Sequence, residues 1–151
     1  MHVVDMVFHW ARMDPHRPAI VLPELVTTFG GLADAIDSLS NRIDQFGLDP
    51  QEPVATATGS PAVSIAVAFA MLRSGFSVAP ANRGLVKHLQ PNGIRNLIYD
   101  VEGFVASGGR NIRFDSSWLP ATPSVGRAYG RRPVGDVDIV LFTAGDHGLP
   151  K

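Results

Sequence analysis

The residues best suited to chemistry stand at the end of the sequence, over Thr143–Lys151. Glycines let backbone N–H groups turn toward an anion, and Gly145 and Gly148 supply that freedom here. The Thr143 hydroxyl can donate a hydrogen bond or bind a metal ion, and Lys151 adds positive charge. The combination is typical of a phosphate-binding loop, although its spacing is not that of a Walker A motif.

The elements before this loop must position it. Asp136–Phe142 contains an apolar run, and Val137–Phe142 is predicted to be a strand that ends at the loop. In open α/β sheets, ligands bind at the carboxyl ends of strands. The position of the loop therefore strengthens the phosphate-binding interpretation.

Upstream of this strand, apolar strands alternate with helical segments, and the connections between them are short. This order is that of βαβ units, so we predict an α/β fold with a mostly parallel sheet and helices on both faces. The predicted strands are Val54–Thr58, Phe76–Ala79, Asn96–Tyr99 and Asn111–Phe114, and the helices between them are Ala62–Arg73 and Leu85–Leu89.

The N-terminal part predicts two amphipathic helices around a hairpin. Val3, Met6, Val7, Trp10 and Ala11 form one apolar stripe of the first helix, with Phe8 beside it. The predicted hairpin pairs Ala19–Leu22 with Val26–Phe29.

The second helix is predicted to begin after Thr28, as its cap, and to end before Gly47. Its polar face holds Asp34, Asp37 and Asp44. We interpret this face as solvated, because no further carboxylate or histidine is placed to complete a metal site.

Composition limits the function classes. The 151 residues fit one α/β domain, 1–151, in which Ser116–Arg132 is an irregular loop. A net charge of −1 gives no nucleic-acid footprint, and the absence of cysteine excludes thiol chemistry. No signal peptide is evident, so a soluble, cytoplasmic protein is expected. The uncharged run Pro53–Leu72 is divided by Gly59-Ser60-Pro61 into a strand and a helix too short to span a membrane.

The sequence shows no catalytic constellation. There is no Ser/His/Asp order, no paired carboxylates and no close histidine pair, so we assign no catalytic residue and no metal ligand. The five histidines are scattered: His2, His9, His16, His88 and His147.

The chain resembles the N-terminal part of an AMP-forming acyl-CoA synthetase, a member of the adenylate-forming ligases. The similarity covers nearly the whole sequence, and the most specific match is Asp136-x-x-x-x-x-Phe142-Thr143-x-Gly145-x-x-Gly148-x-Pro150-Lys151, the phosphate-binding signature of the family. Weaker matches precede it in the expected order: Arg17–Ile20, Thr28-Phe29-x-x-Leu32, Gln51–Ala55 and Ala68–Pro80.

The resemblance implies a parent enzyme that activates a fatty or other carboxylic acid with ATP and Mg²⁺ and passes the acyl group to CoA. Thr143, Gly145, Asp146, Gly148 and Lys151 would be its phosphate-contacting positions. Members of the family continue for several times this length and hold most of the active site there. We therefore expect the 151-residue chain to be inactive as a ligase.

The loop departs from the family at its centre. Ala144-Gly145-Asp146-His147-Gly148 replaces Ser-Gly-Thr-Thr-Gly, so hydroxyl donors are lost and a carboxylate is gained. At ~4 Å and an effective dielectric near 20, a like-charge pair costs about 4 kcal/mol. Mg²⁺ bridging Asp146 to phosphate, or a protonated His147, would offset part of this cost.

Two further hypotheses stay open. The first is that the chain is a non-catalytic interaction module. Half of a ligase sheet would expose apolar surface, through which the chain would form homo-oligomers or associate with the missing ligase portion. The remaining interpretation is an α/β domain whose loop binds nothing.

Overall fold

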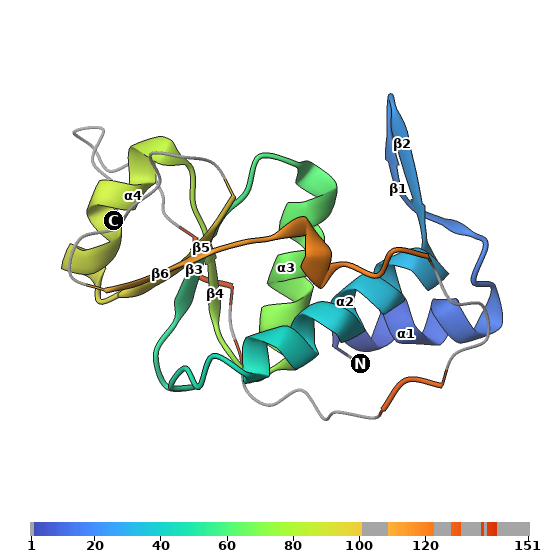
Figure 1. Cartoon of the computed structure of the whole chain (residues 1–151), viewed down its shortest axis with the longest axis horizontal. Helices are drawn as coiled ribbons and strands as arrows, with labels where there is room; N and C mark the ends of the chain where they lie inside the picture. Colours follow the sequence, from blue (N-terminus) through green and yellow to red (C-terminus); the bar gives the residue numbers. More distant parts are fainter. Residues whose placement is uncertain (1, 101–108, 123–127, 131–136, 138, 142–151) are drawn as a thin grey trace.

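The chain folds around a parallel sheet, as predicted. The computed structural model describes residues 2–100, 109–122, 128–130, 137 and 139–141. Four parallel strands form the main sheet in the order β4-β3-β5-β6 (Figure 1). Their bounds are β3 Val54–Ala57, β4 Val78–Pro80, β5 Asn96–Tyr99 and β6 Arg110–Arg113.

The sheet continues beyond β4. Ile139 forms a parallel bridge with Val78, and the Val140 N–H donates to the Val78 carbonyl at 2.8 Å. This bridge lies within the strand predicted over Val137–Phe142, whose described part pairs in the expected parallel sense. Phe142 lies outside the described residues.

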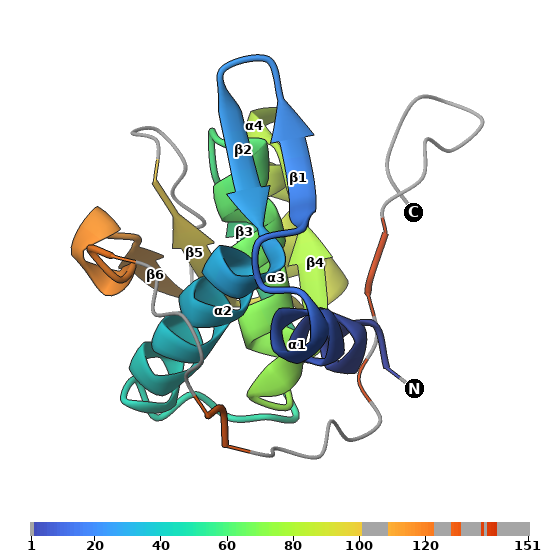
Figure 2. The ribbon, with the colours of Figure 1, turned by 90° about the vertical axis from the view of Figure 1, so that its right-hand side faces the viewer.

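Helices cover both faces of the sheet, because successive strand residues point to opposite sides. Val54, Val78 and Ile98 face a core shared with α1, α2 and α3, whereas Ala55 and Leu97 face a second core with α4. Figure 2 shows α1 beside α2 and α3, with the sheet behind them. The helices are α1 Val3–Met13, α2 Phe29–Asp44, α3 Pro61–Arg73 and α4 Arg83–Leu89.

The predicted caps are confirmed. The Thr28 hydroxyl accepts from the Gly31 N–H at 3.2 Å, and Ser60 caps α3 with Pro61 as its first residue. Before α2, β1 Pro18–Leu22 and β2 Leu25–Thr28 form an antiparallel hairpin that stands away from the helices (Figures 1 and 2). Two 3₁₀ turns, η1 Gln90–Asn92 and η2 Ser116–Trp118, complete the described elements.

The predicted core face of α1 is rotated in the structure. Val3 and Met6 are exposed, whereas Val4 and Phe8 are buried with Val7. The Phe8 ring packs edge-on against Tyr129, with ring centroids 5.0 Å apart. Because this contact comes from a distant segment, the spacing of apolar residues within the helix could not reveal it.

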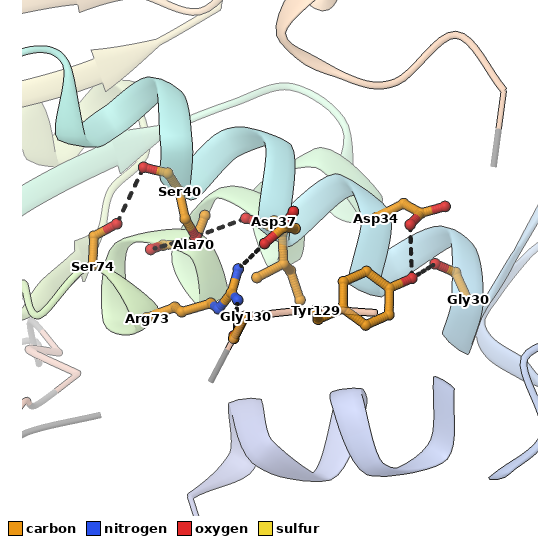
Figure 3. A network of polar contacts seen from close by, with 10 residues as sticks. Gly30, Asp34, Asp37, Ser40, Ala70, Arg73, Ser74, Tyr129 and Gly130 are labelled. Atoms are coloured by element: carbon orange, nitrogen blue, oxygen red, sulfur yellow. Dashed lines mark hydrogen bonds and ion pairs between the residues drawn. The ribbon is translucent and has the colours of Figure 1, made fainter. Parts of the chain in front are cut away.

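The predicted solvated face of α2 is wrong at two positions. Asp34 is fully buried, and Asp37 is 7% exposed. Asp34 accepts a hydrogen bond from Tyr129, and Asp37 forms an ion pair with Arg73 of α3 (Figure 3). Chain that returns from residues 128–130, together with α3, covers this side of α2. The described residues contain no cluster of three or more metal-ligating side chains.

In the described part of the chain, no helix is long and apolar enough to cross a membrane. This agrees with the division of Pro53–Leu72 into β3 and the 13-residue helix α3.

Residue 109 must be glycine because the Arg95 backbone lies too close to it for a β-carbon. A β-carbon at this position would lie 1.6 Å from the Arg95 carbonyl oxygen, immediately before β6 pairs with β5. We expect Gly109→Ala to lower the free energy of unfolding by about 1–3 kcal/mol in urea denaturation, because β6 must shift. Gly130→Ala is the matched control, since a β-carbon there meets nothing within 4 Å. Equal stability of the two variants would contradict the predicted clash.

Candidate functional site at the carboxyl edge of the sheet

The predicted loop residues lie outside the described part of the chain: Thr143, Gly145, Asp146, Gly148 and Lys151. The structure does describe the approach to them. Ile139 is parallel to β4, so Val140 and Leu141 run toward the edge at which the carboxyl ends of the sheet strands meet.

The strand order places a topological switch point at this edge. From β3 the chain passes to β4 on one side and then returns to β5 on the other side. Ligands of doubly wound sheets bind where the order reverses in this way, outside the carboxyl ends of the two central strands. Here those strands are β3 and β5, and the residues that follow them are Thr58–Ser60 and Asp100.

The switch point holds a short polar network. The Gly59 N–H donates to Asp100 Oδ1 at 2.8 Å, which joins the two strand ends. The hydroxyls of Thr58 and Ser64 are hydrogen-bonded to each other, and Ser60 Oγ accepts from the Val63 N–H at 3.5 Å. These contacts fix the first turn of α3 at the edge of the sheet.

The electrostatics of this network oppose anion binding. A helix N-terminus attracts negative charge through its unpaired N–H groups. At α3, however, Asp100 and Ser60 already accept from two backbone N–H groups, those of Gly59 and Val63. A phosphate group would have to displace the Asp100 carboxylate or meet its charge, so these residues do not by themselves form a phosphate cradle.

An apolar cavity of about 380 Å³ opens beside Ser60. Its walls come from β2, α2 and α3, with Leu119 and Pro120 closing one side. The polar lining is limited to hydroxyls and backbone, so the cavity suits an uncharged, apolar group. Its lining includes Leu25, Val26, Leu32, Val63, Ala66 and Leu119.

Asp115 has a shifted pKa. The backbone N–H of Ser117, 2.8 Å from Asp115 Oδ1, and then the Ser117 side chain hold the pKa of Asp115 below its ordinary value. The Asp115 side chain caps η2. Because the pKa is lowered, the stabilisation from this cap is fully present at pH values above the ordinary pKa of aspartate. It is lost as the pH falls through the lower pKa of the folded state.

Solved structures of other proteins match nearly the whole of this chain. The N-terminal subdomain of NpsA from Klebsiella oxytoca matches 99% of this chain with a TM-score of 0.78 and 24% identity. In complex with 3-hydroxybenzoyl-AMSN, that subdomain matches 98% of the chain with a TM-score of 0.75. The fold of this chain is therefore that of the N-terminal subdomain of NpsA, as expected for the N-terminal part of an adenylate-forming ligase. The resemblance inferred from the sequence motifs is thereby confirmed.

Other matches also cover nearly the whole chain. VinN in complex with L-aspartate gives a TM-score of 0.75 at 19% identity over 99% of the chain. The 2-succinylbenzoate–CoA ligase of Bacillus pumilus is 24% identical over 97% of the chain, and a nonribosomal peptide synthetase of Cordyceps militaris is 25% identical over 99%. No protein-family profile matches.

This chain spans less than half the length of each of these relatives. It spans 32% of the Bacillus pumilus ligase, 40% of the NpsA chain and 46% of the VinN chain.

Sequence reasoning missed two pairs of polar residues in this chain. The Gly59–Asp100 contact joins residues 41 positions apart, and the Asp34–Tyr129 contact joins residues 95 positions apart. A usable signal existed for the first pair, since each residue follows closely after a predicted strand. No local signal existed for the second pair.

Proposed function

We propose that this chain is the N-terminal portion of an ATP-dependent acid–CoA ligase. The proposed reaction of the whole enzyme joins a carboxylic acid, such as a fatty acid, to CoA through an acyl-adenylate, with release of AMP and pyrophosphate. The observation that carries the proposal is the 97% coverage of this chain by the 2-succinylbenzoate–CoA ligase match, together with the ordered family motifs.

ATP with Mg²⁺ is the proposed cofactor, and Thr143, Gly145, Gly148 and Lys151 are the proposed phosphate-contacting residues. The contacts at the carboxyl edge of the sheet support the assignment of phosphate binding to the loop. Because Asp100 already accepts from the Gly59 N–H, the phosphate donors are proposed to come from another segment. The parallel bridge at Ile139 directs the chain that precedes the loop toward this edge.

The isolated chain is proposed to lack ligase activity. It spans 32% of the length of the Bacillus pumilus ligase. Asp146 further weakens the loop, because a carboxylate near ATP phosphates is repulsive.

Replacing Asp146 by threonine tests the role of the loop. We expect Asp146→Thr to tighten ATP binding roughly tenfold or more in calorimetric titration with Mg-ATP, because a repulsive charge is removed and a hydroxyl donor is added. Glu24→Thr in the exposed hairpin turn changes the net charge equally and is the control. An unchanged affinity for Asp146→Thr would remove the loop from the phosphate site.

A second candidate, an interaction module, is favoured by one observation. α3 is apolar nearly all round, yet Ile65 and Phe69 are only half-buried, and a largely apolar cavity of about 300 Å³ separates them from α1 and β1. Apolar surface of this kind marks association sites. Light scattering after size-exclusion chromatography distinguishes the candidates: self-association supports the module, whereas a monomer that binds Mg-ATP at micromolar concentration supports the ligase.

A further inference from the structure

Arg73 makes contacts with three separate parts of the chain. Its Nη1 forms an ion pair with Asp37 Oδ1 of α2 at 2.6 Å, and its Nη2 donates to the Gly130 carbonyl at 2.8 Å (Figure 3). The guanidinium carbon lies 4.4 Å from the centroid of the Phe8 ring of α1. Arg73 is 5% exposed, so one buried side chain joins α1, α2, α3 and the returning segment 128–130.

Tyr129 makes the second attachment of this returning segment. Its hydroxyl donates to Asp34 Oδ1 at 2.7 Å (Figure 3). Its ring packs on Phe8. Asp34 is fully buried. A hydrogen bond to a buried carboxylate is stronger than a neutral one, so the attachment is more than an incidental surface contact.

The attachment lies just upstream of the edge of the sheet. Val137 follows Gly130 by seven positions, a length of chain that spans at most roughly 25 Å. Val137 packs on the same core as Tyr129, and Ile139 then pairs with Val78 of β4. Fixing residues 129–130 therefore limits where the chain can meet the sheet.

We propose that Arg73 and Tyr129 are positioning residues that hold the segment 128–130 so that the strand at Ile139 joins β4. Because Thr143–Lys151 follows this strand in the sequence, a weaker attachment is also expected to weaken the proposed binding of ATP. The first part of this inference stands on the described contacts alone, and its consequence for ATP rests on the proposed function.

Loop-closure entropy sets the size of the effect. Without both contacts of the 128–130 segment, the preceding described residue that packs on the rest of the chain is Pro120. The separation in sequence between the fixed residues then grows from about 7 to about 17, and closure becomes about fourfold less probable. Loss of the hydrogen bonds themselves adds to this factor.

The test is amide hydrogen exchange on the full chain, measured by NMR for two variants. Arg73→Lys retains a positive charge for Asp37 but lacks the fork that reaches both Asp37 and Gly130. Tyr129→Phe removes only the hydroxyl and remains informative if Arg73→Lys fails to fold. Arg42→Lys is the matched control, because Arg42 is exposed and its Nη1 donates to Gln45, the C-cap residue of α2.

The readout compares two amides at the edge of the sheet. The Val140 N–H donates to Val78, and the Ala81 N–H donates to the Thr56 carbonyl, both at 2.8 Å. We expect protection of Val140 to fall by up to about fourfold in Arg73→Lys and in Tyr129→Phe, each of which removes one of the two contacts, while Ala81 is unchanged. Unchanged protection of Val140, or an equal fall at both amides, would overturn the positioning role.

Mg-ATP titration of the same variants separates this inference from the proposed function. Selective loss of Val140 protection with several-fold weaker ATP binding supports both. The same loss with unchanged ATP binding supports positioning of the strand and contradicts a phosphate-binding role for the loop.

Discussion

Replacing Asp37 by alanine is expected to lower the free energy of unfolding by about 3–5 kcal/mol, because the Arg73 guanidinium stays buried without its carboxylate. The two atoms that form the pair are 2.6 Å apart, and both residues are less than a tenth exposed. Urea denaturation followed by the fluorescence of Trp10 and Trp118 measures the change.

Two further variants show whether the loss comes from an unpaired charge. Asp44→Ala removes a carboxylate from the exposed side of the same helix and is expected to cost less than about 1 kcal/mol. The double variant Asp37→Leu/Arg73→Met replaces the pair by apolar side chains and is expected to recover most of the stability. If the double variant were as unstable as Asp37→Ala, an unpaired buried charge would not be the cause.

Truncating Ile98 to alanine is expected to cost about 2–5 kcal/mol, through lost apolar burial and the cavity left in the core. Ile98 is fully buried on the central strand β5, on the face covered by α1, α2 and α3. It stands two positions before Asp100, so the same change should loosen the contact between Asp100 and Gly59.

The same denaturation experiment checks this expectation against an exposed position. Val21→Ala in the hairpin removes an apolar side chain that is 69% exposed, and its expected cost is within about 0.5 kcal/mol. A comparable loss in both variants would mean that β5 is not the centre of the core.

Local signals predicted the elements of this fold well. Thr28, Ser60 and Pro61 act within one turn of the helices they begin, and the alternation of strands and helices indicated a parallel sheet with two covered faces. Asn96–Tyr99 is a strand with the predicted bounds, because an apolar run between turn signals needs no distant information.

The periodicity of apolar residues could not predict burial by segments that are distant in the sequence. Asp34 and Asp37 have the spacing of a solvated face, yet chain that returns some 95 positions later covers that side of α2. The rotated core face of α1 has the same origin, since Phe8 packs on Tyr129 from the same returning segment. A pattern within one helix reports which residues are apolar, not which distant residues cover the polar ones.

For the candidate site, only the strand before the predicted loop can be compared with the structure. The bridge from Ile139 to Val78 agrees with the parallel strand predicted over Val137–Phe142, whereas the loop residues lie outside the described part of the chain. The Asp100 carboxylate beside Gly59 went unnoticed, because its significance depends on β3 and β5 being neighbours in the sheet.

Exchange of labelled pyrophosphate into ATP, measured with the purified 151-residue chain and a panel of carboxylic acids, tests the central claim most directly. The proposed function predicts no exchange above background for any acid, because under this proposal the chain is only the N-terminal portion of a ligase and Asp146 lies among its phosphate-contacting residues. Robust exchange that depends on one of the acids would contradict it and show that the chain forms a complete adenylating site.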